Sequence, residues 1–274
     1  MEDPSASVTG SFTDSVGPPL ELLPALRLGG AWQMAIDAWM LERHRPMLRL
    51  YRWRGPTLSL GHHQRRLEPH WLSLARAGAI TLVRRPSGGR AVLHGGDLTY
   101  ALVWPDAQGS REQVYRLACG WLQDTFAAFG MPLQFGRQAA SAQPASCFAL
   151  STAADLVHAD GSKRIGSAQL WRQGCLLQHG SIQLHPQPDL WRELFRSAPP
   201  QLEPLPLDGE ALEQALIASA VRLLPCAASG LVPVGLAAHE LAGISRGVRS
   251  FQLDLASPEA TIERTTGASA SPSG

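Results

Sequence analysis

Lysine is almost absent from this sequence. Of its 24 lysine and arginine residues only Lys163 is a lysine. Arginine can replace lysine at most solvated positions, but it does not give up its proton at usable pH, whereas burial can make a lysine amine neutral and basic. Lys163 is therefore a candidate for amine chemistry. The alternative is a compositional bias that left one solvated lysine by chance.

Cys147 is the cysteine with the setting of a nucleophile. It follows a run of small residues (137–146) and lies sixteen positions before Lys163. We expect a loop there, and loops on a rigid scaffold are where reactive cysteines usually lie. Cys119, Cys175 and Cys226 are expected in a helix, on a strand and near a helix end. The alternative for Cys147 is a buried, inert thiol.

A glycine-rich block of thirteen residues, 84–96 (RRPSGGRAVLHGG), follows an expected strand. Its glycines let the backbone approach a ligand, and its guanidinium and N–H groups suit a phosphate or a carboxylate. It is neither a Walker A loop nor a GxGxxG motif. A tight turn with solvated arginines remains the alternative.

Two further clusters, 161–169 and 178–182, surround Lys163 in sequence. Gly166 lies on the strand expected to carry Lys163, where a small residue lets something pass close to the sheet. His179 is a candidate for the same site, with a hydrogen-bonded core histidine as the alternative.

Periodicity predicts an α/β (α+β) domain with a mixed, largely antiparallel sheet flanked by helices. Asp160-Gly161 predicts a two-residue hairpin turn in which both residues have positive φ, and Gln173-Gly174 a second turn. The expected helices are 31–44, 111–129, 208–224 and 236–245, and the expected strands are 47–53, 57–60, 79–85 and 98–104 with a ladder over 155–184.

Composition favours one cytoplasmic domain over 21–255 between flexible tails, 1–20 and 256–274. A formal net charge of +1 argues against nucleic-acid and membrane partners. The four cysteines show no disulfide or CxxC spacing, and the first 19 residues lack the features of a signal peptide. No run of 18 apolar residues is present that could form a transmembrane helix. We also expect a monomer.

Four ordered blocks, 30–37, 48–61, 84–100 and 163–182, resemble the lipoate/octanoate protein ligase and transferase family, that is, the biotin/lipoate A/B protein ligases. The resemblance covers about residues 20–190. It implies the biotin/lipoate protein ligase fold, which is similar to class II synthetases.

Within this family the chain is most similar to octanoyltransferases of the LipM type. Their Cys-Phe pair precedes the lysine as Cys147-Phe148 does here, whereas ATP-dependent lipoate ligases usually have an Asn-Asp type sequence and often a further C-terminal domain. The resemblance implies octanoyl transfer from octanoyl-acyl carrier protein to a lysine of a lipoyl domain, such as GcvH or an E2 subunit, without ATP or a metal. An ATP-dependent ligase, a lipoyl-domain amidotransferase and a non-enzymatic binding module are the alternatives.

We expect Cys147 to carry the octanoyl group, with the partly desolvated Lys163 as the base used twice. Gly95 stands where the family often has an aspartate, which leaves the group that orients His94 open, and Ser87 replaces a common threonine. Surface arginines such as Arg65, Arg66 or Arg164 are candidates to steer acidic partners. The expected binding residues, lining a tunnel for the acyl chain and the pantetheine arm, are Arg84, Arg85, Ser87, Gly88, Gly89, His94, Gly166, Ser167, Ala168, His179 and Gly180.

Overall fold

The computed structural model describes residues 17–136 and 155–255. In that part of the chain nine strands form a large mixed sheet, in the order β12-β1-β3-β7-β11-β10-β9-β8, with β2 paired to β3. The pairs from β3 through β7, β11, β10 and β9 to β8 are antiparallel, whereas β1 is parallel to both β3 and β12. These strands are β1 (Leu20–Leu22), β2 (Arg27–Leu28), β3 (Met47–Trp53), β7 (Asp97–Trp104), β8 (Gln134–Phe135), β9 (Asp155–Val157), β10 (Lys163–Arg172), β11 (Cys175–Gln183) and β12 (Leu231–Pro233).

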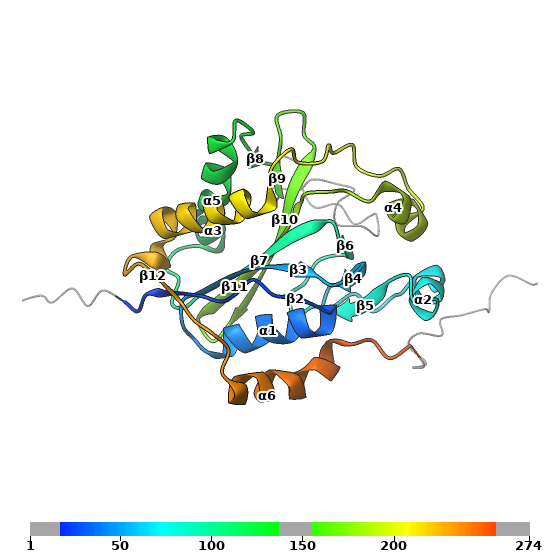
Figure 1. Ribbon diagram of the computed structural model, residues 1–274, viewed down its shortest axis with the longest axis horizontal. Coiled ribbons are helices and arrows are strands. Elements are labelled where there is room, and N and C mark those ends of the chain that lie inside the picture. The colour runs from blue at the N-terminus through cyan, green and yellow to red at the C-terminus, as the bar shows by residue number, and fades with distance from the viewer. Residues whose placement is uncertain (1–16, 137–154, 256–274) are drawn as a thin grey trace, which may run out of the picture.

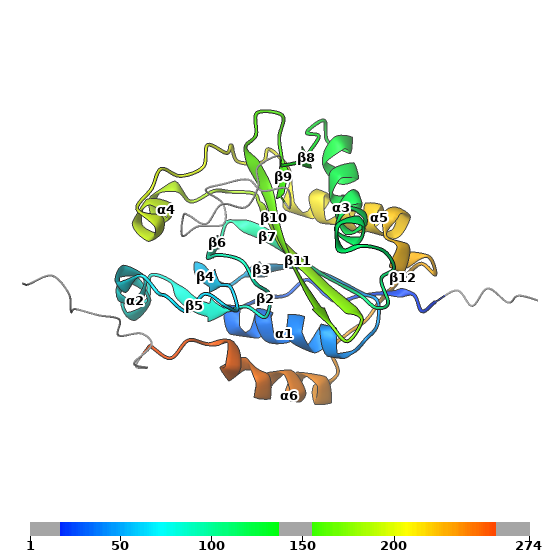
Figure 2. The ribbon, with the colours of Figure 1, turned by 180° about the vertical axis from the view of Figure 1, so that it is seen from behind.

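Helices cover both faces of this sheet, as the two views in Figures 1 and 2 show. Helices α3 (Arg111–Ala128) and α5 (Gly209–Leu223) pack on one face, and α1 (Gly30–Glu42) and α6 (Ala238–Gly247) on the other. On β7, Tyr100 and Leu102 join the core under α3, whereas Ala101 and Val103 join the core under α1. Because side chains alternate along a strand, an apolar strand of this kind must be covered on both faces.

A second, three-stranded sheet was not anticipated from the sequence. It has the order β5-β4-β6, formed by β4 (Thr57–Leu60), β5 (Thr81–Arg84) and β6 (Val92–His94). It packs in its own apolar cluster with α2 (Pro69–Arg76) and α4 (Pro188–Phe195). Short 3-10 helices, η1 (Pro225–Ala227) and η2 (Val248–Phe251), complete the described part of the chain.

The predicted elements are confirmed with small shifts at their ends, but one turn is wrong. Gln173 and Gly174 both have positive φ, 49° and 78°, as a two-residue hairpin turn requires. At the other hairpin only Gly161 does, with φ 86°. His158 and Ser162 close a three-residue loop there, and the Asp160 carboxylate accepts hydrogen bonds from the Ser162 N–H and hydroxyl. Lys163 still opens β10, as predicted.

The predicted tails lie outside the described residues, apart from positions 17–20, of which Leu20 begins β1. Over residues 17–136 and 155–255, no helix combines the length and apolar character needed to cross a bilayer.

Candidate active site

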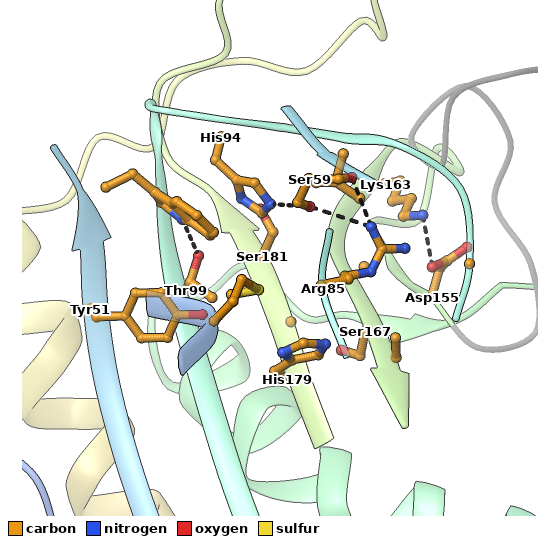
Figure 3. Close-up of a pocket in the computed structure, with 17 residues that line it drawn as sticks. Tyr51, Ser59, Arg85, His94, Thr99, Asp155, Lys163, Ser167, His179 and Ser181 are labelled. Atoms are coloured by element: carbon orange, nitrogen blue, oxygen red, sulfur yellow. Dashed lines mark hydrogen bonds and ion pairs between the residues drawn. The ribbon is translucent and has the colours of Figure 1, made fainter. Parts of the chain in front are cut away.

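A pocket lies where the small sheet faces the large one, beside α1 (Figure 3). The small sheet contributes residues of β4, β6 and the glycine-rich block, and the large sheet contributes residues of β3, β7, β9, β10 and β11. The lining residues are Met34, Tyr51, Trp53, Ser59, Arg85, Gly89, Val92, His94, Thr99, Asp155, Lys163, Gly166, Ser167, Ala168, His179, Gly180 and Ser181.

Lys163 lines this pocket and forms a buried ion pair. Its Nζ lies 2.8 Å from Oδ1 of Asp155 on the adjacent strand β9, and both side chains are only 5% exposed. The pair forms because β9 and β10 are antiparallel neighbours that bring their polar side chains to the same end of the pocket. The lysine could be identified from the sequence, whereas the carboxylate that holds it could not.

His94 is oriented by Asp97, which answers the question left by Gly95. The Nδ1 of His94 lies 2.7 Å from Oδ2 of Asp97, and its Nε2 lies 2.8 Å from the Ser59 hydroxyl. Burial would raise the pKa of Asp97, but the charge of His94 and hydrogen bonds from His94, Ser181 and the Gly95 N–H lower it. An ionised Asp97 can only accept, so His94 donates from Nδ1 and, in its neutral form, accepts the Ser59 proton at Nε2.

His179 is oriented in the same way by a carboxylate from α1. Its Nδ1 lies 2.8 Å from Oδ2 of Asp37, and its Nε2 lies 2.5 Å from the Ser87 hydroxyl. Arg49 on β3 donates to Oδ1 of Asp37 from Nε at 3.0 Å. Burial would raise the pKa of Asp37, but the charges and hydrogen bonds of Arg49 and His179 lower it. The histidine ring is thus locked between α1 and the glycine-rich block.

The arginines of the glycine-rich block hold its backbone in place. Arg85 donates to the carbonyls of Ser59 (2.8 Å), Gly88 (2.7 Å) and Arg90 (2.7 Å). Arg84 donates to the carbonyls of Gly61 and Gln64 and does not line the pocket. A guanidinium with five donors can fix several carbonyls of a turn at once.

Glycines let this block approach the end of β4. A Cβ built on Gly61 would lie 1.8 Å from the Gly89 carbonyl oxygen, so these two backbones touch. Gly89, with φ 93°, lines the pocket, whereas Gly88 and the buried Ser87 do not. Of the predicted binding residues, Arg84, Ser87 and Gly88 therefore lie outside the lining and support it.

The paired strands β10 and β11 form the opposite wall. Gly166, Ser167 and Ala168 face the pocket from β10, and His179 and Gly180 from β11. A Cβ on Gly180 would lie 2.6 Å from both the Ser167 hydroxyl and Cε1 of Tyr100. Gly180 is thus required by the close packing of its neighbours, and Tyr100 fixes Ser167 by a 2.7 Å hydrogen bond between their hydroxyls.

Cys147, the predicted nucleophile, lies outside the described residues. The other three cysteines are free thiols placed as predicted, in α3, on β11 and in η1. Burial raises the pKa of Cys119 to about 12, of Cys175 to about 11 and of Cys226 to about 12. None of these three is therefore set up as a thiolate at neutral pH.

Arg164 is not a surface residue, contrary to prediction. It is 4% exposed, and it donates to His158 Nε2 (2.9 Å) and to the carbonyls of Gln183 (2.8 Å) and Glu203 (3.0 Å). Its burial lowers the guanidinium pKa to about 10. Arg65 and Arg66 are exposed, so the docking prediction now applies to these two alone.

Sequence analysis also missed the three carboxylates Asp37, Asp97 and Asp155. Each comes from an element different from that of the basic residue it holds, although Asp97 at the start of β7 lies only three positions after His94 at the end of β6. An aspartate within an apolar helix stripe or at the start of a buried strand was the available signal, because a buried charge needs a partner.

This chain is similar in sequence to curated octanoyltransferases. The chain is 38% identical over 175 residues to an octanoyltransferase LipM from Kyrpidia tusciae, covering 58% of this chain and 64% of that protein. It is 33% identical over 183 residues to an octanoyltransferase LipM from Anoxybacillus flavithermus, covering 61% and 66%. The matches thus span slightly less than two thirds of these curated relatives.

Solved structures share the fold. A lipoate-protein ligase A bound with ATP superposes with a TM-score of 0.71 at 19% identity, covering 85% of this chain and 95% of the other. A bipartite lipoate protein ligase from Thermoplasma acidophilum superposes with a TM-score of 0.68 at 15% identity, covering 92% and 100%. The predicted mixed sheet with flanking helices and the biotin/lipoate protein ligase fold are therefore confirmed.

The sequence model of the lipoyl protein ligase A/B catalytic domain matches residues 30–202, which is more than half of the chain and includes every residue that lines the pocket. The chain belongs to the lipoyl protein ligase A/B catalytic domain family.

Proposed function

We propose that this protein is an octanoyltransferase of protein lipoylation. It moves the octanoyl group from the thioester of octanoyl-acyl carrier protein to a lysine amine of a lipoyl domain, as in GcvH or an E2 subunit, through an octanoyl-Cys147 intermediate. The observation that carries this proposal is the buried Lys163–Asp155 pair inside the pocket. The octanoyltransferase names of relatives 32–38% identical to this chain support the same activity.

In the first half-reaction the sulfur of Cys147 attacks the thioester carbonyl and the carrier thiol leaves. Cys147 starts as a thiolate because its proton has gone to Lys163, which is protonated in its ion pair with Asp155. Lys163 passes that proton to the departing carrier thiolate, so the net change is exchange of one thioester for another. In the second half-reaction the acceptor amine attacks the octanoyl-Cys147 carbonyl, the neutral Lys163 takes the amine proton, an amide forms and Cys147 leaves as a thiolate. One base thus serves both steps of a ping-pong scheme, and such catalysis is typically worth about 10²–10⁴-fold.

Asp155 fits this scheme as the group that positions Lys163. A carboxylate 2.8 Å from Nζ fixes the end of a flexible four-carbon side chain that otherwise samples several rotamers. In its protonated form Lys163 also offers a positive charge to the thiolate and to the tetrahedral oxyanion.

The remaining pocket wall suits an unbranched acyl chain. Met34, Tyr51, Trp53 and Val92 contribute apolar surface, and Gly89, Gly166 and Gly180 leave room along it. Removing each methylene of an octanoyl chain from water contributes about 0.8 kcal/mol. The pocket therefore favours an acyl chain over a polar substrate of the same length.

The test is to incubate the protein with octanoyl-acyl carrier protein without ATP and to locate the added octanoyl mass by peptide mass spectrometry. We expect the adduct on Cys147 and none in Cys147→Ser. An adduct on Cys119 or Cys175 would refute the assignment. Transfer that requires ATP would instead show a ligase, and transfer from an octanoylated lipoyl domain alone would show an amidotransferase.

Cytoplasmic localisation, independence from ATP and metals, and a monomeric state belong to the same proposal. Size-exclusion chromatography with light scattering measures the oligomeric state, and activity after exhaustive chelation and nucleotide removal measures the cofactor requirement.

A further inference from the structure

Lys163 lies beside a β-bulge. Three pairs define the register of β9 and β10: Asp155 with Gly166, Leu156 with Ile165, and Val157 with Lys163. Arg164 is therefore an extra residue of β10, opposite none of these residues of β9. An extra residue in one strand of an antiparallel pair changes the direction of the side chains that follow it, and such bulges are frequent next to active sites.

The bulge decides which face of the sheet Lys163 occupies. Ile165 and its partner Leu156 join the core under α3. Asp155 and Gly166, the next pair along the two strands, line the pocket. In a regular strand Lys163 would share the face of Ile165, because side chains two positions apart point the same way. The extra residue reverses this, and Figure 3 shows Lys163 and Asp155 pointing toward each other in the pocket.

Hydrogen bonds to three separate segments fix the side chain of Arg164. The guanidinium donates to Nε2 of His158 after β9 (2.9 Å), to the Gln183 carbonyl at the end of β11 (2.8 Å) and to the Glu203 carbonyl after α4 (3.0 Å). Arg164 does not line the pocket, whereas in regular pairing it would take the place of Lys163 opposite Val157, on the pocket face. These hydrogen bonds therefore favour the bulged register.

We propose that Arg164 is a positioning residue for Lys163. As the extra residue of the bulge it turns Lys163 into the pocket, and its guanidinium fixes the bulge. This proposal rests on the proposed function, since it concerns the base of that reaction. Arg164 acts only through Lys163.

The test compares Arg164→Met with deletion of Arg164. Both variants lose the guanidinium and its three hydrogen bonds. Arg164→Met keeps the extra residue without the bonds that fix it, so β9 and β10 can pair regularly and turn Lys163 away from Asp155. The deletion removes the extra residue, so regular pairing leaves Lys163 opposite Val157 on the pocket face. A merely structural role of the guanidinium would impair both variants equally.

The first measurement is spectroscopic and needs no substrate. Lys163 is the sole lysine of the chain, so labelling with ¹⁵N-lysine gives a single side-chain ammonium signal. In the wild type, burial and the ion pair with Asp155 should protect this signal from exchange with water at neutral pH. We expect the deletion to retain the signal and Arg164→Met to shift or lose it. Arg172→Met, at the exposed far end of β10, is the matched control and should retain it.

The second measurement is the rate of thiol release from octanoyl-acyl carrier protein. A displacement of about 1 Å can cost about 10²-fold in rate, so kcat of Arg164→Met should fall by about that factor with KM little changed. The deletion should lose much less. Thermal unfolding of each variant verifies that it is folded. If Arg164→Met does not fold, His158→Phe removes one acceptor of the guanidinium from a partly exposed position and should change both measurements in the same direction.

The outcomes separate this proposal from the proposed function. Equal losses in Arg164→Met and in the deletion refute the positioning role, as does an Arg164→Met variant with the ammonium signal and rate of the wild type. A wild type that shows the ammonium signal but releases no thiol refutes the octanoyltransferase. In that case the ammonium signals of the two variants still decide whether Arg164 orients Lys163.

Discussion

Replacing Asp155 by Asn tests whether the Lys163–Asp155 pair builds the site. The two side chains are 2.8 Å apart and 5% exposed, so the substitution leaves a buried lysine without its charged partner. Removing one partner of a buried ion pair costs about 3–5 kcal/mol of stability. For a chain of this size 1 kcal/mol shifts the melting temperature by about 2–4 °C, so we expect a decrease of roughly 6–20 °C.

The assay is a double-mutant cycle with Lys163→Met. Urea unfolding gives the free energy of unfolding of the wild type, Asp155→Asn, Lys163→Met and the double variant. Because the double variant buries neither charge, it should be less destabilised than the sum of the single variants by at least about 2 kcal/mol.

Activity gives an independent readout of the same pair. A lysine displaced by about 1 Å can lose about 10²-fold in rate, so octanoyl transfer by Asp155→Asn should fall by that order even at temperatures where the variant is folded. Free energies that add within about 0.5 kcal/mol, together with wild-type turnover, would show that the pair neither couples nor positions the base.

Three other predictions test separate parts of the site. Lys163→Arg keeps the charge but cannot act as a base, so its turnover should fall below about a tenth of wild type; higher turnover would show that Lys163 acts only as a cation. The folded pKa of Asp97 is lowered, so its contribution to stability is complete above the ordinary aspartate value of about 3.9 and is lost as the pH falls below it. Asp97→Asn should therefore flatten the decline of unfolding free energy with acid, measured by urea unfolding from about pH 6 to pH 3, and an unchanged slope would contradict this. Gly180→Ala should lower the free energy of unfolding by about 1–3 kcal/mol, because its Cβ would meet Ser167 and Tyr100 at 2.6 Å. Gly88→Ala should leave the free energy of unfolding nearly unchanged, because its Cβ would have no atom within 4 Å. Equal effects of the two substitutions would exclude the steric explanation.

Local patterns were sufficient to predict most elements of this fold. Helices α1, α3, α5 and α6 and strands β3, β4, β5, β7, β10 and β11 follow from apolar periodicity, because each buries a stripe or a face against the core. Elements of two or three residues, such as β2, β6 and β8, are too short to show a period.

The split into two sheets depends on long-range pairing. Strand β4 is parallel to β5 across an intervening helix and antiparallel to β6, which lies directly before β7 of the other sheet. No local signal shows that the chain changes sheets between His94 and Asp97. The turn at Asp160 was missed for a related reason, since its side chain bonds to Ser162 and so favours a longer loop.

In the candidate site, too, some residues could be predicted from local patterns, whereas others depend on long-range pairing. Lys163, His94, His179 and the glycine-rich block could be predicted because their residue types and their resemblance to a family mark them. Their carboxylate partners could not, because pairing across β9 and β10, or between α1 and β11, is a property of the assembled sheet. Because Gly95 replaces the usual aspartate, the family pattern left open which group orients His94, and Asp97 supplies that carboxylate from three residues away.

Those carboxylates bear on which substrate the pocket accepts. Lys163 is paired with Asp155 and His94 with Asp97, whereas His179 and Arg49 share Asp37. Arg85 also lines the pocket, where it donates to backbone carbonyls. The basic side chains of the described wall thus already contact carboxylates or carbonyls, and the wall presents oriented donors and acceptors. An acyl thioester is neutral and requires only oriented groups and apolar surface. The described wall is therefore compatible with the proposed thioester substrate.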